Sequence, residues 1–250
     1  MARAVSFNGQ DLQSSSFATS DLPHENSQLS VDISQVGAYG GRKTNVRVGT
    51  KDLVISGWAK AADASALDTL IDTLKTNMVG KEGNLDVDYA GATRRYTAVC
   101  TGFEVNRGRQ NISMCPVALK FTILSLGKLT SPTTQNNAGK TADYAGSITC
   151  LGSAAPRPTL TLTVNTQTAL SVVRISNDTT VQYLQINRTF VNGDVIIVDC
   201  DAQTVKINGT LVDYVGVIPQ FTQGVNAFTV DITATAVNYD FLLSYYPLYY

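Results

Sequence analysis

The sequence is poor in the residues on which most enzymes and nucleic-acid-binding proteins depend. Only 16% of its 250 residues are charged and the formal net charge is −1, so it lacks the basic surface that holds phosphates or anionic lipid. It has a single histidine, His24, which leaves no partner for a Ser-His-Asp triad, a Cys-His dyad or a multi-histidine metal site. We therefore expect no enzymatic activity, no cofactor and no metal.

Long hydrophobic runs are also missing. No stretch has the length of a bilayer-spanning helix, and Met1–Gly9 contains no apolar signal core, so we expect a soluble chain made in the cytosol and no membrane insertion. The four cysteines, which form no C-x-x-C pair, are expected to be buried free thiols: Cys100, Cys115, Cys150 and Cys200. Cys100 and Cys115 lie on strands that could pair, so a disulfide is geometrically conceivable, but synthesis in the cytosol argues against it.

A β pattern runs over nearly the whole length. A hydrophobic content of 44%, with abundant threonine, valine, asparagine and glycine, is typical of a folded β-rich protein. The length favours two domains of roughly 120 residues each. In the first half, alternation predicts strands at Leu29–Ile33 and Asn45–Val48 with a mobile loop at Gly37–Lys43 between them, and Leu53–Trp58 is a further short apolar run.

One amphipathic helix follows that run. Its apolar residues recur at steps of three and four, which places them on one face: Leu67, Leu70, Ile71, Leu74 and Met78. Asp63 or Ser65 can cap its start, and Gly80 supplies a left-handed stop. The pattern predicts one helix packed against one sheet, with this face as core.

Two hairpins are predicted after the helix. Leu85–Tyr89 and Arg95–Val99 flank a short turn, and Tyr96–Val105 then pairs with Ile112–Leu126 in a ribbon long enough to project beyond a compact core. The loop of this ribbon carries Arg107 and Arg109. These two arginines are either part of a solvated loop or a contact with a neighbouring subunit, so they are the candidate subunit-interface residues.

The domain boundary is predicted where apolar periodicity disappears. Residues 131–147 have many turn-forming residues and are expected to be a linker. Beyond it, short strands recur about every 8–12 residues, which suggests a sandwich or jelly roll over residues 148–250. The predicted strands are Pro158–Val164, Ala169–Ser176, Thr180–Asn187, Asp194–Cys200, Thr204–Ile207, Ala227–Ala234 and Tyr239–Tyr245.

Some segments resemble functional motifs without meeting their requirements. Ala138–Thr141 is similar to the end of a phosphate-binding loop, but Thr134 stands where the earlier glycine is required. Ser244–Tyr250 is rich in tyrosine and can either stack on a sugar or partner, or seal an aromatic core. Five aspartates could supply carboxylate pairs for glycoside cleavage, but a solvated strand face explains each of them: Asp32, Asp86, Asp88, Asp199 and Asp201.

The order and spacing of the segments resemble the distal tail protein family of siphophages. Val5–Leu12 resembles the family's initial aromatic-Asn-Gly strand, and Leu53–Gly57 with the helix after it resembles the core of its ring-forming domain. Asp194–Asp199, Thr204–Gly209 and Gly224–Val230 resemble the Gly-Asp strand, the Asn-Gly turn and the Gly-x-Asn turn of its galectin-like domain.

This resemblance implies a mainly β fold in three parts. Residues 1–130 would be a ring-forming tail domain with a β-sheet, one packed helix and a long hairpin, residues 131–147 a linker, and residues 148–250 a galectin-like β-sandwich of jelly-roll type. The protein would be a structural component of the virion at the phage tail tip, assembled in the host cytoplasm.

The resemblance also implies the partners. A homo-hexameric ring would join the tail-tube protein above to a tail-associated hub or lysin protein below. DNA would pass through the lumen without specific binding, since a near-neutral wall makes few phosphate contacts.

Two alternatives stay open. A tail-tube protein also forms hexameric rings from β-sheets, a helix and a long hairpin, but would not require the C-terminal Asn-Gly and Gly-x-Asn turns. A carbohydrate-binding module acting in host adsorption would use the galectin-like half, and binding of cell-wall glycans by that half would favour it.

Overall fold

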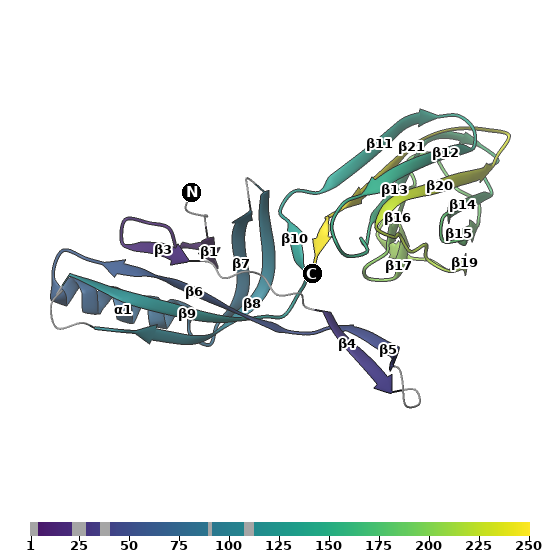
Figure 1. The fold of residues 1–250 in the computed structure, drawn as a ribbon. Helices are drawn as coiled ribbons and strands as arrows, with labels where there is room; N and C mark the ends of the chain where they lie inside the picture. The colour runs from purple at the N-terminus through teal and green to yellow at the C-terminus, as the bar shows by residue number, and fades with distance from the viewer. Residues whose placement is uncertain (1–4, 22–28, 36–40, 90–91, 108–112) are drawn as a thin grey trace. The chain divides into compact units, whose positions relative to one another are not determined.

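The protein folds into two units (Figure 1), and in both of them buried and exposed residues alternate along the strands. The computed structural model describes residues 5–21, 29–35, 41–89, 92–107 and 113–250. Contacts divide the chain into Met1–Thr130 with Tyr250, and Ser131–Tyr249. The mainly β fold with a single packed helix that the sequence predicts is confirmed for these residues.

The first unit is built on one antiparallel sheet. Its strands follow the order β2-β1-β7-β8-β9-β6-β3, and β10 also pairs with β8. Both predicted hairpins are present, as β7 with β8 and as the long ribbon of β8 with β9. The elements are β1 Val5–Phe7, β2 Gln10–Asp11, β3 Phe17–Asp21, β6 Lys51–Lys60, α1 Ala64–Met78, β7 Glu82–Tyr89, β8 Ala92–Val105, β9 Met114–Ile123 and β10 Gly127–Leu129.

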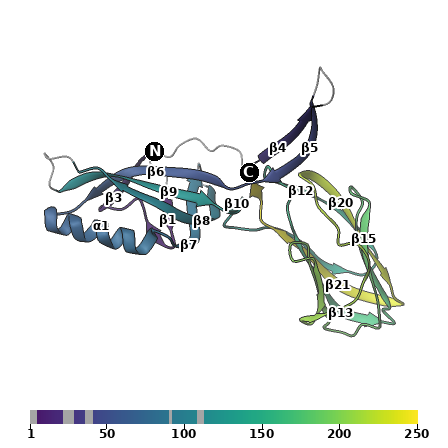
Figure 2. The same cartoon turned by 90° about the horizontal axis from the view of Figure 1, so that it is seen from below.

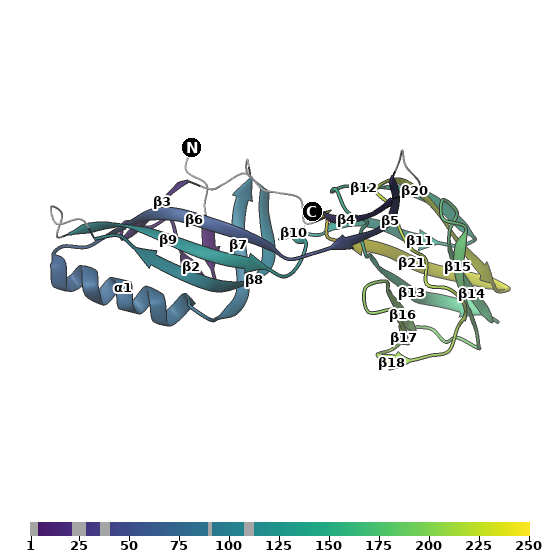
Figure 3. The ribbon, with the colours of Figure 1, turned by 60° about the horizontal axis from the view of Figure 1, so that its bottom comes forward.

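Helix α1 covers one face of this sheet (Figure 3). The residues that it buries are Leu67, Ile71, Leu74 and Met78. They join the inward-facing strand residues in one core, in which the rings of Phe7 and Phe121 lie 5.0 Å apart. The expectation that Leu70 is equally buried is wrong, because it lies at the margin of the apolar stripe and is only partly covered.

The ends of α1 are set by local chemistry. Asp63 has extended backbone angles, and its carboxylate accepts the Ala66 N–H at 2.8 Å, which satisfies one of the unpaired donors of the first turn. Two residues after the last helical residue, Gly80 adopts a φ of 72° that glycine reaches without strain. The sequence thus determines both limits of the helix.

Strands β4, Leu29–Gln35, and β5, Gly41–Val48, form a sheet of their own (Figure 2). Each pairs with the other, and neither joins the larger sheet of the first unit. The predicted loop at Gly37–Lys43 is too long, because Gly41, Arg42 and Lys43 belong to β5; residues 36–40 lie outside the described residues. We call this pair the β4–β5 arm.

The second unit is a sandwich of two antiparallel sheets. One has the order β11-β21-β13-β16-β17-β18 and the other the order β12-β20-β14-β15-β19. The inward residues of both form one core. The strands are β11 Thr133–Lys140, β12 Tyr144–Cys150, β13 Thr159–Thr168, β14 Val172–Asn177, β15 Gln182–Asn187, β16 Val195–Asp199, β17 Thr204–Ile207, β18 Thr210–Leu211, β19 Val215–Gly216, β20 Gly224–Thr233 and β21 Ala236–Tyr245. The short strand β22, Leu248–Tyr249, belongs to neither of these two sheets.

Residues 131–147 are not a linker, which corrects the expectation from sequence. They form β11 and the first half of β12, and these strands pair with β21 and β20. The Tyr144 hydroxyl reaches the side-chain oxygen of Asn137 at 2.7 Å and so ties the two strands together. Both are terminal strands of their sheets with little buried surface, and for that reason their sequence resembles a loop.

The four cysteines are free and buried, as expected from the sequence. Burial raises the pKa of the Cys150 thiol to about 11. The pKa of Cys200 rises to about 12, chiefly through burial and also through the neighbouring carboxylate of Asp199. Thiols of this kind pack as small apolar groups and are poor nucleophiles at neutral pH.

Candidate assembly surface

Asp199 and Asp201, the candidate carboxylates of the second unit, have structural partners. Asp199 accepts the backbone N–H groups of Asp201 and Ala202, each at 2.9 Å, and so shapes the turn after β16. Asp201 pairs with Arg157 at 2.6 Å. Within the described ranges, no group of three or more His, Cys, Asp and Glu side chains is placed to hold a metal ion. His24 and the side chain of Asp32 lie outside the described residues.

The segment similar to a phosphate-binding loop is part of a strand edge. Residues 138–141 lie at a bulge of β11, where Gly139 has a φ of 65°. The Gly139 N–H donates to the Asp240 carboxylate at 2.7 Å, and the Lys140 ammonium lies 4.3 Å from the centroid of the Tyr144 ring. The amide that would face a phosphate in such a loop is therefore turned to a carboxylate of its own unit.

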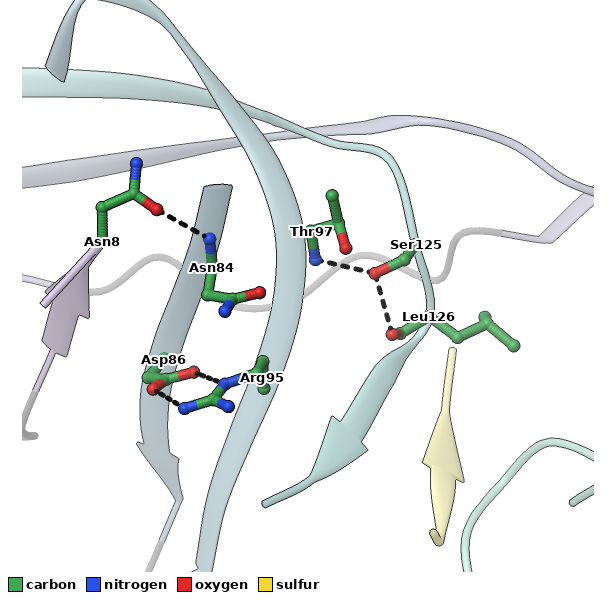
Figure 4. A network of polar contacts seen from close by, with 7 residues as sticks. All are labelled: Asn8, Asn84, Asp86, Arg95, Thr97, Ser125 and Leu126. Atoms are coloured by element: carbon green, nitrogen blue, oxygen red, sulfur yellow. Dashed lines mark hydrogen bonds and ion pairs between the residues drawn. The ribbon is translucent and has the colours of Figure 1, made fainter. Parts of the chain in front are cut away.

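In the first unit, Asp86 is held by an arginine. Its carboxylate makes two bonds of 2.7 Å with the Arg95 guanidinium, directly opposite on β8. Figure 4 shows this pair beside two other bridges. Such a two-bond pair helps to fix the register of the β7–β8 hairpin, and this structural role accounts for Asp86.

The other bridges of Figure 4 connect the same hairpin to its neighbours. The side-chain oxygen of Asn8, in the turn between β1 and β2, accepts the Asn84 N–H at 3.0 Å. The Ser125 hydroxyl accepts the Thr97 N–H at 2.8 Å and donates to the Leu126 carbonyl at 3.2 Å. These contacts brace β7 and β8 from both sides.

Of the two predicted interface arginines, the structure describes Arg107 alone. The Arg107 guanidinium forms an ion pair with Asp68 on helix α1 of its own chain, and both side chains are about half exposed. Arg109 lies outside the described residues. A subunit contact through Arg107 and Arg109 stays a prediction, and Arg107 already has an intramolecular partner.

A shallow groove of about 340 Å³ lies on the sheet face turned away from helix α1. Its floor is the middle strand β9, where the outward residues Pro116 and Ala118 are small. Trp58 on β6 lies directly opposite Pro116, and Glu104 on β8 lies directly opposite Ala118. Small residues between an aromatic and a carboxylate therefore make the hollow.

The walls of this groove are exposed and chemically different. The Trp58 side chain is 43% exposed, an unusual place for the single tryptophan of the chain. Glu104 has no hydrogen bond or ion pair in the part of the chain that the structure describes. The nearby outward cation of β9, Lys120, is bound to Asp52 at 3.2 Å. We call the surface formed by Ser56, Trp58, Glu104, Asn106, Pro116 and Ala118 the Trp58 groove.

Sequence reasoning missed the Trp58 groove, although one signal was present. Leu53 and Ile55 face inward, so strict alternation along β6 puts Trp58 outward. Treating Leu53–Trp58 as a uniform apolar run hides this. The positions of Glu104 and Pro116 beside Trp58 depend on strand pairing and are not visible in the pattern.

A buried polar network holds one end of the sandwich in the second unit. Asn226, which is fully buried, donates to the Thr222 carbonyl at 2.7 Å and accepts the Thr222 N–H at 2.9 Å. Asn177, also fully buried, donates to the Gln220 carbonyl at 2.8 Å. The Gly-x-Asn turn at Gly224–Asn226 is thus a brace for the loop before β20.

The tyrosine-rich end of the chain is partly in the core. Tyr245 is buried; its hydroxyl donates to the Thr149 carbonyl at 2.9 Å and accepts the Leu151 N–H at 3.0 Å. Tyr246 is 42% exposed. Sealing of the sandwich therefore explains Tyr245.

Among the described residues, no helix is long and apolar enough to cross a membrane.

Comparison with known proteins identifies the second unit. Residues 151–245 match the family described as siphovirus-type tail component, C-terminal domain. This match covers most of the second unit. The resemblance to siphophage tail proteins found in the sequence is confirmed by this match.

The fold of the whole chain is similar to that of solved phage proteins. The Dit protein of phage SPP1, described as a paradigm of the hub adsorption apparatus in phages that infect Gram-positive bacteria, has a similar structure. Its TM-score is 0.70 at 16% identity, covering 98% of this chain and 99% of that one. A chain of the phage P2 baseplate in its activated conformation with calcium has a TM-score of 0.51 at 6% identity, with 98% of both chains covered. No curated protein matches the chain by sequence.

Proposed function

We propose that the chain is a distal tail protein whose copies form a hexameric ring between the tail tube and the tip or baseplate hub. The observation that carries this proposal is the match of residues 151–245 to a siphovirus tail component family. The similarity of the whole chain to the SPP1 Dit fold supports it, because both units take part. A tail-tube protein is disfavoured, since it would not require this C-terminal domain.

Ring formation is assigned to the first unit. Among the described residues, the β4–β5 arm pairs only within itself, and a two-stranded hairpin alone is marginally stable in water. Contact with a neighbouring copy would supply the missing surface. The second unit has a closed core of its own and is placed outside the ring.

The proposed ring would have two roles, letting DNA pass through its lumen and connecting two other tail proteins. With a net charge of −1, its wall would make few phosphate contacts, so DNA would pass without specific binding. One surface of the ring would dock the tail-tube protein and the other a hub or lysin protein. The function is structural and non-enzymatic, in a virion assembled in the host cytoplasm.

The direct test is the assembly state of the purified full chain. Light scattering should give six times the 26.8 kDa chain mass, and negative-stain images should show a ring with peripheral lobes. A chain that stays monomeric at every concentration and shows no ring would contradict the proposal. Images of a uniform stacked tube without lobes would favour the tail-tube alternative.

A second candidate, carbohydrate binding, is favoured by one exposed sheet face of the second unit. The Arg174 guanidinium lies 4.1 Å from the centroid of the exposed Tyr183 ring, and its Nε atom is 3.9 Å from an Asp231 oxygen. Aromatic and charged groups on one face are suited to a sugar ring. Binding of cell-wall glycans that is lost in Tyr183→Ala, but not in the control Tyr214→Ala at another exposed tyrosine of this unit, would support this function; equal binding by both would oppose it.

A further inference from the structure

The Trp58 groove combines the two features that recognise an arginine side chain. A cation lying over an indole ring is attracted by its π electrons, and tryptophan is the strongest aromatic partner. A carboxylate on the opposite wall, Glu104, can accept hydrogen bonds from the same guanidinium. Because the guanidinium is flat, one face can stack on Trp58 while an edge reaches Glu104, which a lysine ammonium cannot match.

The groove is built for an occupant that its own described residues do not provide. Glu104 is exposed and has no ion-pair partner among them, whereas Lys120, an outward cation of β9, is neutralised by Asp52. Lys60, two positions after Trp58 on β6, is an exposed cation on the same face. The volume of about 340 Å³ is at the small end of binding pockets. It suits a side chain or a short loop better than an extended ligand.

The chain itself carries a loop of complementary charge. Residues 106–110, which follow β8 in the sequence, read Asn-Arg-Gly-Arg-Gln and include no acidic residue. Arg107 is already bound to Asp68 on the helix side of the sheet, the side opposite the groove. Arg109 is the remaining cation of this loop.

We propose that the Trp58 groove receives Arg109 from the β8–β9 loop of a second copy of this chain. The proposal rests on the assembly of copies proposed above and names one contact between neighbours. Arg107 then holds the base of the loop on its own helix, while Arg109 reaches across to the next copy. Buried tryptophan and arginine pairs commonly dominate the energy of protein interfaces.

The test is a charge exchange in the full chain, with light scattering over a range of concentrations as the measurement. Glu104→Arg and Arg109→Glu should each raise the concentration needed for assembly by about tenfold or more, because each places like charges together. The double variant restores an opposite-charge pair and should recover most of the assembly. Asp213→Arg, on an exposed loop of the second unit, is the matched control and should assemble normally.

Trp58 provides a second measurement because it is the only tryptophan. Its emission should shift to shorter wavelength as the wild-type chain assembles, and should not do so in Glu104→Arg. Equal melting temperatures of the variants would exclude misfolding as the cause.

Three other results would separate failure of the groove contact, failure of the role of a second copy and failure of the proposed function. Normal assembly of both single variants, failure of the double variant to recover, or Trp58 emission unchanged in a formed oligomer would overturn the groove contact while leaving the proposed ring intact. An emission change in Arg109→Glu that does not depend on concentration would assign the contact to a single chain and overturn the role of a second copy. A wild-type chain that never assembles would overturn the proposed function, and the groove contact with it.

Discussion

The side-chain oxygen of Asn8 occupies the place that a Cβ atom on Gly83 would take. Asn8 has a left-handed φ of 50° in the turn after β1, and its side-chain oxygen accepts the Asn84 N–H of β7 at 3.0 Å. The first strand of the chain is therefore docked through a close approach that depends on the absence of a side chain on the strand beside it.

Gly83→Ala should accordingly destabilise the first unit by about 1–3 kcal/mol, since the new methyl group must displace the Asn8 amide. Asn8→Gly keeps the left-handed turn and removes the amide. In the double variant the alanine has room. Its loss of unfolding free energy, measured by urea unfolding, should therefore be smaller than the sum of the losses in the two single variants. Strict additivity would show that the two residues are not coupled.

The apolar face of helix α1 is expected to be core rather than a contact with another protein. Leu74→Ala should lower the free energy of unfolding by about 2–5 kcal/mol, because Leu74 is 3% exposed. Leu70→Ala should cost about 1 kcal/mol, since Leu70 is only partly covered. If assembly is lost in either variant while thermal stability is unchanged, the face is an interface.

The beginning of the second unit can be tested by truncation. A fragment of residues 131–250 should unfold cooperatively, because it keeps β11 and β12. A fragment of residues 148–250 keeps β13 beside β21 but loses β11, the other partner of β21, and the Ala142 carbonyl that accepts the Tyr239 hydroxyl at 3.0 Å, so it should be unstable or aggregate. Similar melting temperatures for the two fragments would mean that β11 contributes nothing to the fold.

The buried cysteines predict a pH dependence of stability. Their pKa values are raised in the folded chain, to about 11 for Cys150 and about 12 for Cys200, so the unfolded chain releases these protons first. Stability should therefore be fully present below about pH 8.5, the ordinary thiol range, and fall as the pH rises toward 12.

Cys150→Ala with Cys200→Ala should flatten this decline in unfolding experiments. Alkylation at pH 8 should modify none of the four thiols in the native chain and all four after denaturation. Rapid modification of the native chain, or a disulfide in intact-mass spectra, would contradict the burial seen here.

Regular alternation made much of the fold predictable from sequence. The strand predicted at Thr204–Ile207 has the same first and last residues as β17. The spacing of Leu67 and Leu74 predicted the buried face of the helix. The sequence of residues 133–140 does not predict a strand. β11 is a terminal strand that buries little surface, so its side chains need not alternate between apolar and polar. The Trp58 groove could not be predicted, since it joins β6, β8 and β9 through pairings between distant parts of the chain.

The bulge of β11 bears on what happens when many copies are crowded together. β11 is the terminal strand of its sheet, and between Asn137 and Lys140 its pairing with β21 shifts while the Gly139 N–H is taken by Asp240. An incoming strand from another chain would find the ladder interrupted after a few residues. Sandwiches held at high local concentration are thereby hindered from fusing edge to edge, which is how exposed strands seed fibrils.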